Sequence, residues 1–148
     1  MTILETALLL AQASARTSAH IDSYLARIGV DFADLRRLRA IGAAADGVTW
    51  RDLAAEMTES RSQAVRSTRP LEKLGWVHST DGRFALTDSG RHLLATAEEI
   101  AANAAAPWFA DCGFSAAEVS EYLRPLATVD RSSTREEPAG QPSQPESE

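Results

Sequence analysis

The chain has 148 residues, of which 44% are hydrophobic and 24% charged, and this matches a soluble globular protein of about one domain. Its 15 Lys and Arg against 21 Asp and Glu give a net charge of −6, which excludes a wholly basic nucleic-acid binder but permits a local basic face. The single cysteine, Cys112, excludes an internal disulfide and a cysteine-rich zinc site. No apolar run is long enough to span a bilayer, and the first ten residues lack the basic start of a signal peptide, so we expect a cytoplasmic protein without membrane contact.

Two helices are predicted at the start of the chain. Residues 1–28 carry an apolar stripe at helical spacing, and Gly29 supplies the stop. This stripe is wider than one small domain usually covers, which favours a partner helix. Asp31 can cap a second helix over 32–45, and Asp46-Gly47 then breaks it.

Two further helices follow, separated by a very short turn. Thr49 is a favourable N-cap for a helix over 50–57. The polar residues 58–60 separate it from a helix that runs to Leu74, in which we expect a bend at Pro70 because proline removes one backbone hydrogen bond. A short helix, a three-residue turn and a following helix form the helix-turn-helix unit, whose second helix can enter the DNA major groove.

A β-hairpin is predicted directly after this unit. Residues 76–80 and 83–87 flank Asp81-Gly82, a strong signal for a two-residue turn. The resulting register places three apolar residues on one face: Val77, Phe84 and Leu86. Three polar residues share the other face: His78, Thr80 and Arg83.

Two helices and a tail complete the chain. Thr87 can cap a long helix over 88–105, which we expect to end near Pro107, and a last helix is predicted over 116–128. Residues 130–148 have no apolar period and carry 2 basic and 5 acidic residues, so we predict a disordered acidic tail of charge −3.

The second helix of the helix-turn-helix unit has an inner and a cationic side. Three side chains at helical spacing point inward: Ala64, Thr68 and Leu71. Four polar or basic side chains lie on another side: Ser62, Arg66, Arg69 and Lys73. From Arg61 to Arg83 there are 5 basic and 2 acidic residues, which gives +3 within a chain of −6. On an isolated helix such a face is usually only solvated, but the adjoining turn and hairpin favour contact with guanine or phosphate.

The stretches SRSQAVRSTRPLEKLGWV (60–77) and FALTDSGRHLL (84–94) carry a family resemblance. The pattern Arg-x-x-x-x-Arg-x-x-x-Pro-Leu-Glu and the turn Leu-Thr-x-x-Gly are its most specific parts. With them, residues 31–128 resemble the winged helix-turn-helix of the MarR family of transcriptional regulators. The resemblance implies a mainly α fold with a small β-hairpin wing, in which 1–30 and 88–129 form long dimerisation helices and 31–87 the DNA-binding lobe.

The same resemblance implies a sequence-specific regulator, a repressor that binds a palindromic operator in double-stranded DNA as a homodimer. It further implies release by a small aromatic or lipophilic ligand, and no cofactor. Matched positions would contact DNA: Ser60, Arg61, Ser62, Gln63, Arg66 and, in the wing, Arg83; the cationic face adds Arg69. The wing is shorter than is usual in the family, so Arg83 would reach backbone phosphate rather than the minor groove. Three residues would line the effector pocket: His20, Tyr24 and Arg91.

Two other functions fit the sequence. The acidic body, short wing and acidic tail favour a winged-helix protein-interaction module that no longer binds DNA. A sensor role for Cys112 would instead give a redox-switched repressor. No catalytic motif and no metal-ligand spacing occurs, so we expect neither an enzyme nor a metal site.

Overall fold

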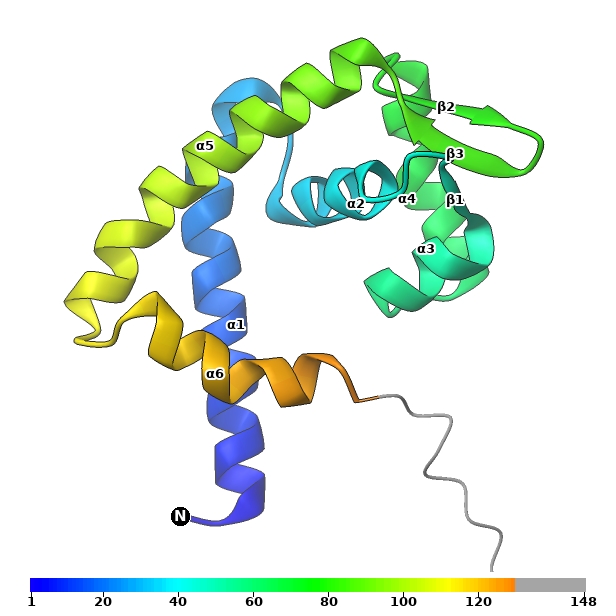
Figure 1. The fold of residues 1–148 in the computed structure, drawn as a ribbon. Helices are drawn as coiled ribbons and strands as arrows, with labels where there is room; N and C mark the ends of the chain where they lie inside the picture. The colour runs from blue at the N-terminus through cyan, green and yellow to red at the C-terminus, as the bar shows by residue number, and fades with distance from the viewer. Residues whose placement is uncertain (130–148) are drawn as a thin grey trace, which may run out of the picture.

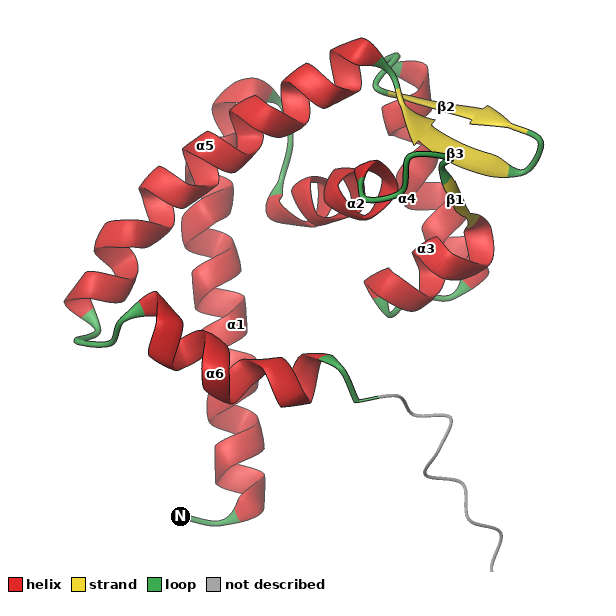
Figure 2. Cartoon of the chain, in the orientation of Figure 1, coloured by secondary structure: helices red, strands yellow, loops and turns green. Residues whose placement is uncertain are grey.

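Residues 1–129 are described by the computed structural model, so the predicted tail over 130–148 lies outside the described residues. Most of the described chain is helical, and its three short strands lie together at one end (Figure 2). The long helix α5 (Asp88–Asp111) runs from that end to the far side of the molecule, where it lies beside the N-terminal helix α1 (Figure 1). No helix in this part of the chain is both long and apolar enough to cross a membrane.

Helix α1 spans Ile3–Leu25 and continues as a 3₁₀ turn, Ala26–Ile28, which confirms the helix predicted over 1–28. Thr2 and Glu5 form a reciprocal capping box at its start. Gly29 follows the turn with φ +78°, a left-handed conformation that glycine adopts without steric cost.

Helix α2 spans Phe32–Gly42 and ends three residues before the predicted boundary at 45. Asp31 caps it as predicted, and the Phe32 N–H donates to the Asp22 carboxylate of α1 at 2.6 Å. The chain then forms strand β1 (Val48–Thr49), which the sequence did not predict because two residues are too few to show a period.

Helices α3 (Trp50–Met57) and α4 (Arg61–Lys73) confirm the helix-turn-helix unit. Pro70 lies inside α4, and the helix continues beyond it to Lys73. Proline removes only one backbone donor there, and the following residue, Leu71, is buried in the core and holds the last turn in place.

Strands β2 (Val77–Thr80) and β3 (Arg83–Leu86) form the predicted hairpin. The predicted register is confirmed, with Thr80 opposite Arg83 at the turn. Asp81 and Gly82 both have positive φ, as a two-residue hairpin turn requires. Strand β1 pairs with the outer side of β3, so the sheet has the order β1-β3-β2.

The prediction that α5 ends near Pro107 is wrong, because the helix continues to Asp111. Pro107 removes one backbone donor, but Trp108 directly after it stacks on the His20 ring of α1, with ring centroids 4.4 Å apart. This packing against α1 outweighs the local cost of the proline. The last helix, α6 (Ala116–Ala127), lies where it was predicted.

The buried side chains form two hydrophobic clusters, one on each side of α2. The lobe cluster contains Leu38, Ile41, Leu53, Met57, Leu71, Val77, Phe84 and Leu86. The helical cluster contains Ile21, Leu25, Val30, Leu35, Ala97, Ile100 and Ala101. Trp76, Leu93 and Leu94 pack against both clusters, so the start of α5 joins the winged lobe to the terminal helices.

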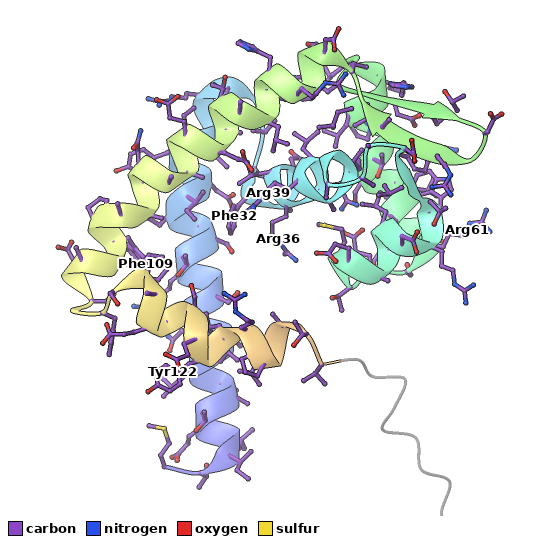
Figure 3. The ribbon with its side chains drawn as sticks, viewed as in Figure 1. Phe32, Arg36, Arg39, Arg61, Phe109 and Tyr122 are labelled. Atoms are coloured by element: carbon purple, nitrogen blue, oxygen red, sulfur yellow. The ribbon has the colours of Figure 1, made fainter. Side chains whose placement is uncertain are left out.

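The terminal helices leave large apolar side chains uncovered. In α1 no residue before Ile21 is buried, and Leu8 is 59% exposed. Helix α6 has no buried residue, and Tyr122 on it is 79% exposed and projects from the helix in Figure 3. A single chain therefore leaves the apolar surface of its terminal helices exposed.

Candidate DNA-binding surface

Side-chain caps define where each helix of the helix-turn-helix unit begins. The Thr49 hydroxyl accepts from the Asp52 N–H at 3.2 Å at the start of α3. At the start of α4 the Ser60 hydroxyl accepts from the Gln63 N–H at 3.2 Å, and Gln63 Oε1 accepts from the Ser60 N–H at 3.1 Å. Ser60 and Gln63, both predicted to contact DNA, thus cap α4; the Gln63 side-chain nitrogen takes no part in the cap and remains a donor.

Helix α4 presents the two predicted sides. Ala64, Thr68 and Leu71 are buried inside the lobe, and the Thr68 hydroxyl donates to the Ala64 carbonyl at 2.7 Å. The cationic side is exposed, and its members are Arg61, Ser62, Arg66, Arg69 and Lys73. The helix therefore rests on its small and apolar residues and presents its cations to solvent.

A shallow hollow of about 380 Å³ lies on this exposed side, lined by Arg61, Ser62, Val65, Arg66 and Arg69. Within residues 1–129 none of its three guanidinium groups forms an ion pair. Figure 3 shows Arg61 at the outer edge of the lobe, away from α1 and α5. An unpaired guanidinium keeps its donors available for a phosphate or a guanine edge.

The wing arginine is placed differently from the arginines of α4. Arg83 is exposed, but its Nη1 donates to the Gly47 carbonyl at 3.2 Å, just before strand β1. It shares a hollow of about 500 Å³ with two carboxylates, Asp46 and Asp81. Its side chain therefore lies across the sheet rather than extending from the hairpin tip, and its predicted phosphate contact stays a prediction.

A buried ion pair that the sequence did not indicate joins α2 to the turn of the helix-turn-helix unit. Arg37 Nη1 and Nη2 donate to the two carboxylate oxygens of Glu59 at 3.0 and 2.6 Å. The side chain of Arg37 is 2% exposed, whereas its neighbour Arg36 is exposed to solvent. Nothing in the sequence distinguishes these adjacent arginines, because the side on which each falls depends on the tertiary packing of α2.

Asp34 lies one turn before Arg37 on α2 and is partly buried. Burial raises the pKa of its carboxyl, and the nearby negative charge of Asp31 acts in the same direction. The Asp31 N–H, which donates to Asp34, and the positive charge of Arg37 oppose this shift without cancelling it.

The structure does not bring the three predicted effector residues together. His20 lies between Tyr24 and Trp108, and its Nε2 is 3.0 Å from the Ala104 carbonyl oxygen. Arg91 donates to Asp88 and to the Leu86 carbonyl in the first turn of α5. Since Arg91 and Ala104 are 13 residues apart on one helix, about 20 Å separates the two groups.

A different hollow, of about 570 Å³, lies between α2 and α3. Leu53 and Met57 contribute apolar surface from α3, and Arg36 lies on the α2 side, where Figure 3 shows its side chain projecting from the helix. Asp52 and Glu56 stand on the opposite rim. The combination of apolar surface and a guanidinium was not visible in the sequence, because α2 and α3 meet only in the fold.

Cys112 and the metal-binding side chains were the remaining subjects of the sequence predictions. Cys112 is exposed at the C-terminal end of α5, and its sensor role stays a prediction. Within the described residues no group of three metal-binding side chains comes together.

No protein-family model matches the chain, and no curated protein matches it either. Solved structures do match. A MarR-family transcriptional regulator from Rhodococcus sp. RHA1 is 25% identical with a TM-score of 0.75, over 82% of this chain and 89% of that one. CouR from Rhodococcus jostii RHA1, bound to p-coumaroyl-CoA, is 25% identical with a TM-score of 0.75, over 82% and 88%.

The MarR family protein Rv2887 of Mycobacterium tuberculosis, in complex with DNA, is 24% identical with a TM-score of 0.65, over 81% of this chain and 93% of that one. The same protein has also been solved with salicylic acid. All three relatives match most of their own length, so the similarity includes the terminal helices as well as the winged lobe. The fold predicted from the sequence is confirmed: the chain has the winged helix-turn-helix fold of these MarR-family transcriptional regulators.

Proposed function

We propose that the chain represses transcription as a homodimer that binds a palindromic operator through the exposed side of α4. The observation that carries this proposal is a row of arginines on the second helix of the helix-turn-helix unit, Arg61, Arg66 and Arg69, which form no ion pair with any residue from 1 to 129. The wing would add contacts to the flanking backbone. The DNA complex of Rv2887 supports this function, because that protein has the same fold.

Dimerisation would occur through the terminal helices. Their exposed apolar residues include Leu4, Leu8 and Leu9 of α1 and Tyr122 and Leu126 of α6. A two-fold dimer places two recognition helices in successive major grooves, so half-sites should lie about one helical turn, or about 34 Å, apart.

Release of DNA would follow the binding of an aromatic or lipophilic anion in the hollow between α2 and α3. Its volume of about 570 Å³ is typical of small-molecule sites. Leu53 and Met57 would receive the apolar part, and Arg36 the anionic group. Salicylic acid bound to Rv2887 and p-coumaroyl-CoA bound to CouR have this combination of aromatic ring and negative charge. The ligand would act by changing the position of the recognition helices.

Selection of sequences from random duplexes, followed by binding titrations of Arg66→Ala, tests the proposal. We expect the selected site to be palindromic, and Arg66→Ala to weaken binding by about 1–3 kcal/mol and to reduce the dependence of affinity on salt. Arg27→Ala is the matched control, because Arg27 is exposed but lies outside the lobe. Salicylate added to the wild-type complex tests release in the same assay.

A protein-interaction module is the second candidate, favoured by the net charge of −6. The same titrations separate the two functions. If no duplex is selected and Arg66→Ala changes nothing, the interaction module replaces the DNA-binding function.

A further inference from the structure

The bidentate pair of Arg37 and Glu59 is unusual for this protein because of its burial. Its side chains are 2% and 19% exposed, whereas both other ion pairs in the described residues lie at the surface. The Nε of Arg37 is also buried and has no hydrogen-bond partner within residues 1–129. Removing two charges from water is costly, so a buried pair is poorly explained as a stabilising device.

The pair acts on a strained turn. Thr58, directly before Glu59, has φ +54° and ψ +45°, a left-handed conformation that is unfavourable for a β-branched residue. The N–H groups of Thr58 and Glu59 donate back to Ala55 and Ala54 at 3.1 and 2.9 Å, and so end α3. Such strain persists only where the surroundings hold the backbone firmly.

Glu59 lies between this strained residue and Ser60, the N-cap of α4. Arg37 therefore holds the residue directly before the N-cap of α4. Helix α2, which carries Arg37, is itself fixed, because the Phe32 N–H binds Asp22 of α1 and Leu38 is fully buried. The ion pair therefore connects the turn before α4 to a helix that contributes buried residues to both hydrophobic clusters.

We propose that Arg37 and Glu59 are positioning residues that set the direction of α4, and with it the placement of Arg61 and Arg66 on DNA. Neither side chain touches DNA in this role. The inference rests on the proposed function of α4 and adds the residues that orient it.

The test replaces the pair by apolar residues, Arg37→Met with Glu59→Leu, in the full chain. Apolar replacement of a buried ion pair usually preserves stability, so we expect a thermal midpoint close to that of the wild type. Affinity for the selected duplex should fall about tenfold, which corresponds to about 1.4 kcal/mol, and its salt dependence should weaken as in Arg66→Ala, because Arg61 and Arg66 no longer meet the duplex in the wild-type geometry. A double variant with wild-type stability and wild-type affinity would overturn the positioning role.

Glu59→Gln is the second variant, for the case in which the double variant does not fold. It retains the shape of the side chain and removes its charge, and we expect a severalfold loss of affinity while the circular dichroism spectrum stays that of the wild type. Glu98→Gln is the matched control, since it removes the carboxylate of the exposed Arg39–Glu98 pair, 3.1 Å long, and should leave affinity unchanged. Equal affinities of the two Gln variants would overturn the proposal.

The results also distinguish a failure of the positioning role from a failure of the proposed DNA-binding function. A wild-type chain that selects no duplex would refute the proposed function and the positioning role together. A wild type that selects a duplex, combined with variants of the pair that bind equally well, would refute the positioning role alone.

Discussion

The winged lobe buries its large apolar side chains, whereas the terminal helices expose many of theirs. In the lobe, Leu38, Ile41 and Phe84 are at most 2% exposed, and the cluster closes within one protomer. In the terminal helices, Ile3 and Tyr122 are 92% and 79% exposed, although they belong to well-formed helices with capping boxes. The apolar core of the lobe closes within one chain, whereas large apolar side chains at the terminal helices are left exposed.

This difference separates two properties of the proposed DNA-binding dimer. The shape of the proposed DNA-binding surface would be determined inside each lobe, by caps, the hairpin register and the buried pair of Arg37 and Glu59. The distance between two such surfaces would be determined by the terminal helices. Substitutions in the two regions should therefore change different measurements.

Leu8→Glu should produce the largest effect, by breaking the proposed dimer. Leu8 is 59% exposed in the protomer, and full burial of a leucine contributes about 1.5–3 kcal/mol. Because a two-fold interface carries the substitution twice, the dimer dissociation constant should rise by at least two orders of magnitude, which corresponds to about 2.7 kcal/mol. Analytical ultracentrifugation measures this constant, and circular dichroism should show that the helices remain.

Leu74→Glu is the control for that experiment. Leu74 is also an exposed leucine, at 58%, but it lies in the winged lobe at the end of α4. It should leave the dissociation constant unchanged. Equal weakening by both substitutions would show that the terminal helices are not the dimer surface.

The lobe was more predictable from sequence than the rest of the chain, since its signals are local. Thr49, Ser60 and Asp81-Gly82 each act through neighbours within three residues, and the caps and hairpin register follow directly from them. The cationic side of α4 was predictable for the same reason, because helical spacing alone separates Arg66 from Ala64.

Features that depend on distant contacts were not predictable. Helix α5 passes Pro107 because Trp108 packs on His20, which is 88 positions away in the chain. Arg37 became a buried partner of Glu59 only through the packing of α2 on the helix-turn-helix unit. The sequence also does not show that Arg91 lies about 20 Å along α5 from Ala104, which His20 contacts.

Gly90→Ala tests the packing at the junction of the winged lobe and the terminal helices. A Cβ on Gly90 would lie 1.9 Å from the Trp76 carbonyl oxygen, which already accepts the Thr87 N–H at 3.0 Å. Since backbone must move to admit the methyl group, we expect a loss of about 1–3 kcal/mol in the free energy of unfolding, measured by urea titration. Ser89→Ala, on an exposed neighbour, should change it by less than about 0.5 kcal/mol. A Gly90→Ala chain as stable as the wild type would mean that α5 is not held closely against the lobe.

Asp34→Asn should give the smallest effect, and one with a definite pH dependence. Burial raises the pKa of the Asp34 carboxyl above its ordinary value, so ionisation of Asp34 is less favourable in the folded chain than in the unfolded chain. Its favourable contribution to stability is therefore complete below about pH 3.9 and is lost as the pH rises through the folded-state pKa. An amide avoids this loss and can still accept from the Asp31 N–H, so the variant should gain stability relative to the wild type between pH 4 and 7. Asp52→Asn, at the equivalent position of the exposed α3 cap, is the control and should show no such gain. If Asp34→Asn instead loses stability at pH 7, the attraction between the Asp34 carboxylate and Arg37 outweighs the effect of burial.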